Sequence, residues 1–259
     1  VNGGKYTPSF FNEEREVCNL EVCKYQTTQD MWMEVMGNNP SEFKGGRRPV
    51  ENVSWWDALE FCNKLSEKYG LKPVYDLSRK EEGILRIHQL NGKTEYPNVA
   101  DFRKTEGFRL PTEVEWEWFA RGGEIAMQDG TFDYKYSGSN NTDEVAWHKG
   151  NSGDQTHDVG IKKPNQLGLY DCSGNICEWC YDTTNSGYIS EKIPYIYDET
   201  ENDRRLRGGC WDIDDYKDNI SISKRYSNSA NSTITSVTLL SNYFKTVQIS
   251  CGFRIVRTI

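Results

Sequence analysis

Helix-start signals fall in the first half of the chain, and the clearest strand signal lies near residue 250. At three positions a Thr or Ser is followed three places later by an acid: Thr27 with Asp30, Ser54 with Asp57, and Thr112 with Glu115. Each pair is typical of a helix N-terminus, and apolar residues at helical spacing follow it. From residue 247 to residue 256 apolar residues alternate with others, as do Ile220 and Ile222. This order predicts an α+β fold with early helices and late antiparallel strands.

The segments around these elements are predicted to be irregular. Residues 1–15 lack periodicity and are expected to form an N-terminal approach segment, followed by a single domain over residues 16–259. A short strand is expected at residues 73–77. Residues 78–107 are polar and punctuated by Gly and Pro, so they predict a long excursion with little regular structure.

Charge and hydropathy exclude some classes of partner. The net charge is −8, so the chain lacks the basic field that gathers nucleic acid or an anionic membrane. No apolar run approaches the roughly 20 residues that span a bilayer. The sequence starts at Val1 without a charged and then apolar leader, so a signal or lipid-bearing segment would lie outside it. Eight cysteines in 259 residues are too sparse for a disulfide scaffold.

Gly208 and Gly209 permit backbone conformations that other residues resist, and Trp211 beside them supplies a large anchor for a core, so a fixed hinge is predicted here. The composition changes after the segment Arg207-Gly208-Gly209-Cys210-Trp211. Residues 212–259 contain no Glu, Trp, Met or Pro, and Asp, Asn, Ser, Thr and Tyr take their place. Small polar and aromatic side chains on a rigid base are the chemistry of an adaptable binding surface. A solvated polar loop region is the other interpretation, because loops collect such residues.

Several phrases of the sequence together resemble a known family. In order along the chain they are Val35–Phe43, Pro49–Trp55, Phe108–Glu113, Gly168–Asp171, Gly174-Asn175 with Glu178-Trp179, and Arg207–Gly209 with Gly252–Arg254. This set resembles the formylglycine-generating-enzyme (sulfatase-modifying factor) family from about residue 21 to residue 257. That family is similar to C-type lectins in fold. The resemblance therefore implies a small antiparallel sheet with flanking helices and much irregular structure.

The resemblance also implies an activity that the residues do not support. The enzymes of this family oxidise a substrate cysteine with copper and oxygen, using two cysteines placed two and seven residues after the matching Trp. Here those places hold Ile213 and Asp218, and neither side chain can replace a thiolate as copper ligand or reactive sulfur. We therefore expect no catalytic residues. The alternative is a sulfatase-modifying oxidoreductase, or a related enzyme, that uses a relocated thiol such as Cys210.

A second chemistry is suggested by cysteine spacing alone. Cys172, Cys177 and Cys180, with Cys210 further on, match the plant-type ferredoxin spacing for a two-iron cluster. In the family that the chain resembles, however, the positions of Cys177 and Cys180 pack into the core. Buried free cysteine behaves as a small hydrophobe, and this is the interpretation we favour.

Calcium is the metal that the resemblance implies. Family members hold this ion in the matching loop through positions that correspond here to Asp171, Gly174, Ile176 and Glu178. Carboxylate and carbonyl oxygens suit calcium. In the alternative, Asp171 and Glu178 accept hydrogen bonds from neighbouring backbone instead. A structural calcium is thus a candidate, and no cofactor is expected to be required.

A sub-branch of the family, the variable proteins of diversity-generating retroelements, resembles this chain further. There the segment after the Trp displays residues rewritten by adenine-directed mutagenesis, and an Asn codon rewritten at its adenines cannot give Lys, Glu, Gln, Trp or Met. Between residues 212 and 250 only four residues fall outside that alphabet: Lys217, Lys224, Lys245 and Gln248. The resemblance implies a non-enzymatic ligand-binding protein whose variable region spans about 212–250.

Ten residues of this region are predicted to face the ligand: Asp212, Ile213, Asp214, Tyr216, Asp218, Asn219, Tyr226, Asn228, Ser229 and Asn231. Tyr216 and Tyr226 are expected to be aromatic anchors, and the Asp and Asn side chains to set polar specificity. We expect a protein or glycan ligand on another cell, no nucleic-acid partner and a monomer. The resemblance implies a bacterial surface or exported protein, with a lipid-anchored form compatible.

Overall fold

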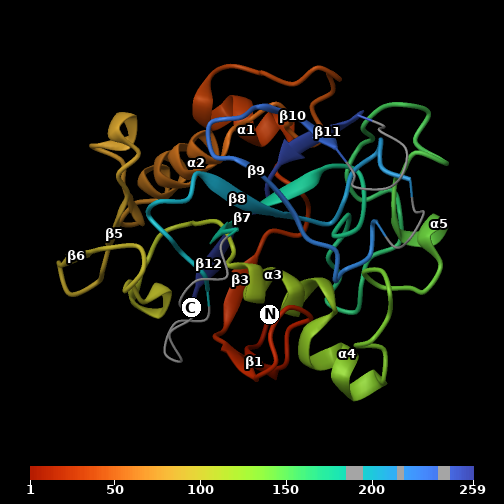
Figure 1. The fold of residues 1–259 in the computed structure, drawn as a ribbon, viewed down its shortest axis with the longest axis horizontal. Coiled ribbons are helices and arrows are strands. Elements are labelled where there is room, and N and C mark those ends of the chain that lie inside the picture. The colour runs from red at the N-terminus through yellow and green to blue at the C-terminus, as the bar shows by residue number, and fades with distance from the viewer. Residues whose placement is uncertain (185–194, 215–218, 239–245) are drawn as a thin grey trace.

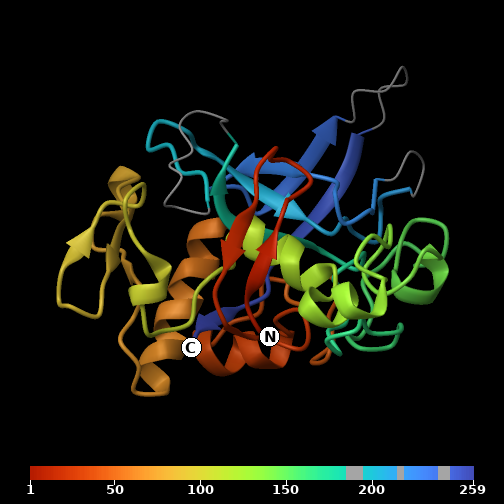
Figure 2. The same ribbon diagram turned by 90° about the horizontal axis from the view of Figure 1, so that it is seen from below.

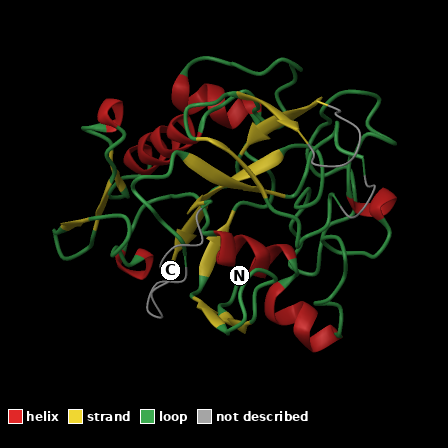
Figure 3. Ribbon diagram, viewed as in Figure 1, coloured by secondary structure: helices red, strands yellow, loops and turns green. Residues whose placement is uncertain are grey.

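The computed structural model describes the chain except for residues 185–194, 215–218 and 239–245, and it describes only the backbone of residues 234–238 and 246–249. In Figure 1 a twisted sheet occupies the centre of the molecule and the helices lie around it. Figure 3 shows how much of the chain between these elements is loop. No helix among the described residues has the length and apolar character needed to cross a bilayer.

Three helices confirm the start signals in the sequence: α1 (Gln29–Met36), α2 (Trp55–Lys68) and α3 (Glu113–Ala120). Ser54 and Thr112 form capping boxes with the acids three places later, so two N-termini begin as predicted. The first helix is capped by Thr28, whose hydroxyl accepts from the Met31 amide, and not by Thr27.

Two further helices, α4 (Gly123–Asp129) and α5 (Thr142–Val145), were not predicted. Gly122 has φ +91° and lets the chain turn between α3 and α4, so the two glycines after α3 end one helix and start another.

The main sheet has the order β10-β11-β7-β8-β9. Its strands are β7 (Cys177–Thr183), β8 (Asp203–Arg207), β9 (Tyr226–Ser229), β10 (Ile234–Thr238) and β11 (Thr246–Gly252). All neighbours are antiparallel except β11 and β7, which pair in parallel through Cys251 and Cys177. The strand predicted over residues 247–256 is confirmed only as far as Gly252, where β11 ends, and Val256 belongs to a separate strand. Ile220 and Ile222 are buried in turns and not in a strand.

The N-terminal residues are more regular than expected. β1 (Gly4–Tyr6) pairs with β2 (Arg15–Val17), which corrects the prediction of an irregular approach segment over residues 1–15. β3 (Leu20–Val22) pairs with β12 (Val256–Thr258), so segments from opposite ends of the chain lie side by side.

The polar segment of residues 78–107 also contains more regular structure than predicted. The short strand expected at residues 73–77 is present as β4 (Tyr75–Asp76), and it forms a three-stranded sheet with β5 (Arg86–His88) and β6 (Thr94–Glu95). Single 3₁₀ turns lie at Lys80–Glu82 and Phe102–Lys104. Figure 2 shows this sheet projecting from one side of the body.

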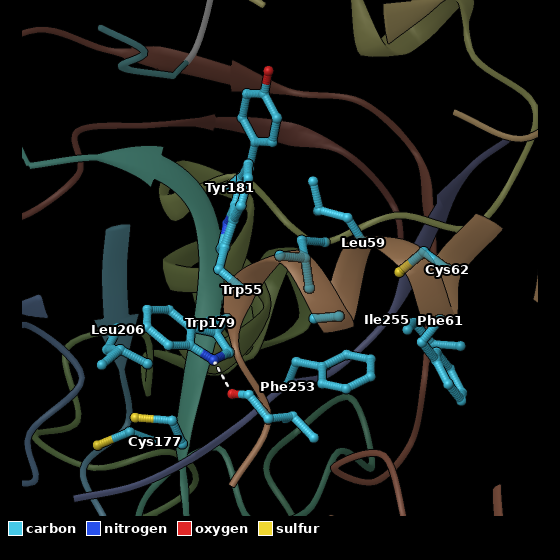
Figure 4. Packing of buried hydrophobic residues seen from close by; sticks show 14 of the residues in the cluster. Trp55, Leu59, Phe61, Cys62, Cys177, Trp179, Tyr181, Leu206, Phe253 and Ile255 are labelled. Atoms are coloured by element: carbon cyan, nitrogen blue, oxygen red, sulfur yellow. Dashed lines mark hydrogen bonds between the residues drawn. The ribbon is translucent and has the colours of Figure 1, made fainter. Parts of the chain in front are cut away.

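The two faces of β7 explain where the core lies. Side chains alternate along a strand, so Trp179 faces the cluster that contains Trp55 of α2, while Cys180 faces the cluster that contains Trp116 of α3. The indole nitrogens of Trp55 and Trp179 donate to the carbonyls of Cys180 and Val53 at 2.9 and 3.0 Å. Figure 4 shows Trp179 beside Leu206 and Phe253 in the larger cluster. The helices α2 and α3 thus hold the central strand from opposite sides.

Candidate binding surface

Two glycines end β8 and turn the chain toward the candidate surface. Gly208 and Gly209 have φ +88° and +71°, a region that other residues rarely adopt. A Cβ on Gly208 would lie 3.0 Å from the Cys172 carbonyl oxygen, and the Gly208 carbonyl accepts from the Gly174 amide at 2.8 Å. The turn predicted at this segment is therefore held against the loop that precedes β7.

Arg207 fixes the start of this turn to α3. Its guanidinium donates to Glu113 at 2.8 Å and to Glu117 at 2.7 Å, and all three side chains are fully buried. Arg225, next to β9, donates twice to Glu113 at 2.6 Å. Burial opposes ionisation of both acids, but the arginines keep the pKa of Glu113 and of Glu117 below their usual value. The result is a buried ion network under the surface.

Asp182 of β7 adjoins this network. Its carboxylate accepts from the amides of Glu113 and Ile196 at 2.7 and 2.8 Å. Burial, together with the nearby Glu113 charge, raises the pKa of Asp182 to about 7. A buried acid that holds its proton near neutral pH makes the stability of the region around the buried ion network depend on pH.

Trp211 anchors the chain after the turn. Its indole nitrogen donates to the Ser250 hydroxyl at 2.7 Å, and its ring meets Phe43 edge-on with centroids 5.4 Å apart. Its amide donates to the Asn175 carbonyl at 3.0 Å, and its carbonyl accepts from Ser152 at 3.0 Å. The anchor role predicted for this Trp is consistent with these contacts.

Two of the residues predicted to face the ligand are buried. Ile213 is 0% exposed, and its carbonyl accepts from the Lys149 amide at 3.2 Å. Tyr226 is 5% exposed, and its hydroxyl donates to the Asn219 carbonyl at 2.5 Å. The prediction is corrected for both: their apolar surface goes to the core, and they support the surface from below.

The other eight residues predicted to face the ligand fall into two groups. Tyr216 and Asp218 lie outside the described residues. Six side chains are exposed or half-buried, and we call them the polar surface: Asp212, Asp214, Asn219, Asn228, Ser229 and Asn231. The Ser229 hydroxyl accepts from the side-chain amide of Asn202 at 2.8 Å. Small polar groups on a fixed base can bind by hydrogen bonds with little ordering cost.

A loop that the sequence did not single out adds charge to this surface. Lys149 donates to Asp212 at 2.5 Å and to Asp154 at 2.6 Å, and its ammonium lies 5.8 Å from the centre of the Trp211 ring. Hydrogen bonds from the ammonium to the two carboxylates raise the pKa of Lys149 above its usual value. No sequence signal connects residue 149 to residue 212, because their contact depends on the tertiary fold.

The cysteines do not form a metal cluster in the described structure. Cys172 and Cys180 pack in the cluster with Trp116, whereas Cys177 and Cys210 pack in the cluster with Trp55. Within the described ranges, no three His, Cys, Asp or Glu side chains meet so that they could hold a metal ion. The described structure thus divides these four cysteines between two core clusters, as expected for buried free thiols. Burial opposes ionisation of the Cys210 thiol, yet hydrogen bonds from Cys177 and from the Asp212 and Ser250 backbone lower its pKa.

The loop predicted to hold calcium has protein partners for most of its donors. The carbonyls of Asp171, Gly174 and Ile176 accept from the side-chain amide of Gln26 at 3.0, 3.3 and 3.0 Å. The Glu178 carboxylate accepts from Arg254 at 2.8 and 3.2 Å and from the Trp116 indole at 2.9 Å. This donor set, as it stands, does not fit a bound calcium, because the Gln26 amide and the Arg254 guanidinium already donate hydrogen bonds to these oxygens.

Comparison with known proteins identifies the same family over nearly the whole chain. The family model for the sulfatase-modifying factor enzyme 1-like domain matches residues 4–259. Chaperone protein LppX of Paenibacillus barcinonensis is 39% identical over 206 residues, which cover 70% of each chain. The formylglycine-generating enzyme of Streptomyces coelicolor is 31% identical over 143 residues, which cover 51% of this chain and 45% of that enzyme.

A solved structure extends the likeness to the whole fold. The structure of Treponema denticola variable protein 1 matches with a TM-score of 0.73 and 31% sequence identity, over 100% of this chain and 94% of that one. Its mixed helices and small sheets agree with the α+β class predicted from the sequence.

Proposed function

The chain belongs to the family of sulfatase-modifying factor enzyme 1-like domains, and on this premise we propose that it is a non-enzymatic ligand-binding protein. The observation that carries the proposal is Ile213, which is 0% exposed. The family resemblance assigns this position to a thiol that binds copper. A buried aliphatic side chain supplies no such sulfur, so the oxidase chemistry lacks one of its two ligands here.

The likeness to a variable protein supports a diversified ligand surface. That structure aligns with the whole of this chain, including the segment after Trp211. We propose that residues 212–250 carry the variation and that the polar surface is its described part. Comparison of this gene among sister isolates tests the point: substitutions should concentrate at exposed positions of 212–250, and an even scatter along the chain would overturn it.

We propose a polypeptide, and not a glycan, as the ligand. A relative that matches 70% of the chain is named a chaperone protein, and a chaperone binds other polypeptides. Asp212, Asp214 and Asn231 offer the carboxylate and amide groups that pair with peptide main chain and basic side chains. A ligand on another cell, a monomeric state and a bacterial surface or exported location belong to the same proposal, and a lipid-anchored form is compatible with it.

The rival is an oxidase that uses Cys210 as a relocated thiol. Cys210 is 0% exposed under Trp211, so a peptide substrate cannot reach its sulfur in the described conformation. The discriminating assay supplies copper, a reductant, oxygen and a cysteine-bearing sulfatase peptide. We expect no aldehyde in the peptide. Turnover that Cys210→Ser abolishes would overturn the binding-only function.

Binding itself is tested with a displayed peptide library and a glycan array. We expect peptides to be selected and their binding to fall at least tenfold in a variant that combines Asp212→Ala with Asp214→Ala, a loss of about 1.4 kcal/mol. The matched control is Asp133→Ala, because Asp133 is a fully exposed acid outside the polar surface. Equal loss in the control, or selection of glycans alone, would contradict the proposal.

A further inference from the structure

Three main-chain carbonyl oxygens in the loop before β7 converge on one side chain from the other end of the sequence. They belong to Asp171, Gly174 and Ile176, and the side chain is Gln26, whose amide nitrogen lies 3.0–3.3 Å from each oxygen. Gln26 is 0% exposed and Asp171 is 3% exposed. The Gln26 amide therefore meets these carbonyls inside the protein and away from its surface.

A cluster of oxygens around one point is the usual environment of a hard cation. Calcium binds carbonyl and carboxylate oxygens at about 2.3–2.6 Å. The Gln26 amide nitrogen carries two hydrogens with partial positive charge, so it can take the place of the ion without adding net charge. We infer that the Gln26 amide closes the loop of residues 171–178 in place of a cation.

The charge balance around the loop supports this inference. Glu178 accepts two hydrogen bonds from Arg254, whose guanidinium also donates to the carbonyls of Tyr170 and Cys23 at 2.6 and 2.9 Å. A divalent ion in the loop would meet that fixed positive charge and would compete with the guanidinium for Glu178. The arginine thus supplies the positive charge that a metal would otherwise bring.

Two further buried oxygens make the loop resemble a cation site. Within the described part of the chain, Oε1 of Gln26 and Oδ1 of Asp171 are buried and have no hydrogen-bond partner. The other Asp171 oxygen accepts from the Gly160 amide at 2.8 Å. A carboxylate in place of the Gln26 amide would add negative charge beside three carbonyls and would demand a cation. The identity of residue 26 therefore decides whether the loop needs a metal.

Closure of this loop also affects the candidate surface. The inference itself rests on the loop geometry and not on the proposed function. Asn175 accepts from the Trp211 amide, and Gly174 donates to the Gly208 carbonyl, so the loop holds the turn that carries the polar surface. A loop closed by an amide keeps this turn in place at any calcium concentration.

Thermal unfolding of three purified proteins tests the inference, each in excess EDTA and in excess calcium chloride. The wild type should show the same melting temperature in both and no stoichiometric calcium by elemental analysis. Gln26→Glu should melt several degrees lower in EDTA and regain stability with calcium. Gln26→Met keeps the length of the side chain without its donors, so it should melt lower in both conditions.

Each result decides the question. A wild type that contains one calcium per chain, or that melts lower in EDTA, would show that a cation and not the amide closes the loop. A Gln26→Glu protein without any calcium response would show that the carbonyls do not form a cation-shaped site. If Gln26→Glu does not fold in EDTA, its preparation in calcium followed by elemental analysis supplies the same measurement.

Discussion

The buried ion network, which contains Arg207 just before the glycine turn, and the polar surface, which begins just after that turn, are opposite in construction. Arg207, Glu113 and Glu117 have no exposure, and each charge meets a fixed partner. Asp214 and Asn231, by contrast, are exposed. A change in the first region leaves a buried charge, whereas a change in the second alters only what a partner meets. The fold thus separates side chains whose loss leaves a buried charge from side chains whose loss leaves the core unchanged.

The largest expected effect comes from the network. Arg207→Met leaves Glu113 and Glu117 without their shared buried cation, so we expect a loss of about 3–5 kcal/mol in the free energy of unfolding. Urea denaturation measures it. Arg103→Met is the matched control, since that arginine is 61% exposed in its pair with Asp101 and should cost less than about 1 kcal/mol. Similar losses in both variants would remove the contrast between the regions.

The glycine turn should give the next largest effect. Gly208→Ala places a Cβ 3.0 Å from a carbonyl oxygen at a positive φ, so we expect a loss of about 2–3 kcal/mol. Gly37→Ala has φ +77° with open space around the new Cβ, and backbone strain alone should cost about 1–2 kcal/mol. Urea midpoints of the two variants compare them, and a larger loss at Gly37 would contradict a close-packed turn.

Asp182 makes the stability of the region around the buried ion network dependent on pH. Its pKa rises from an unfolded value of about 3.9 to about 7 on folding, so the folded state binds the proton more tightly. The stability that this proton contributes is fully present below the unfolded pKa and is lost as pH rises through about 7. Asp182→Asn should flatten the decline in melting temperature between about pH 4.5 and about pH 7.5. Asp133→Asn should keep the wild-type slope, and an unchanged slope in Asp182→Asn would refute the assignment.

The smallest effect on stability is expected at the polar surface. Asp214→Asn and Asn231→Ser should each change the free energy of unfolding by no more than about 0.5 kcal/mol. Ile213→Asn is the internal control, because it buries an amide in the core and should cost about 2 kcal/mol or more. Chemical denaturation of the three proteins shows whether adjacent positions 213 and 214 differ as the structure requires. An Ile213→Asn protein as stable as the wild type would show that position 213 belongs to the polar surface and not to the core.

Local signals in the sequence were sufficient for the helices but not for the sheet. Ser54 and Thr112 start helices where their acids predict, because a capping box is made within four residues. β7 was not predicted as a strand, because every one of its residues is buried and its sequence shows no alternation. β8 was missed because Leu206 is the only apolar residue in its sequence. The parallel pairing of β11 with β7 depends on long-range contacts that no short motif encodes.

The turn beside the candidate surface could be predicted, but the direction of the side chains that follow it could not. The Gly-Gly-Cys-Trp segment marked the turn, because positive φ and a large anchor are properties of single residues. Composition could not tell which polar-region side chains point inward, so Ile213 and Tyr226 were placed on the surface. Lys149 and Gln26 were missed because each acts through a partner more than 60 residues away.

The position of β11 between β10 and β7 has a consequence for how the protein is made. β7 can complete its hydrogen bonds on that side only after residue 252 has been synthesised, and β3 waits for residues 256–258. Non-local pairing of this kind slows folding, because a long loop must close before contacts reward it. That edge of the central strand therefore stays unpaired until β11 has emerged. Completion of the main sheet is therefore expected to be a late step in folding.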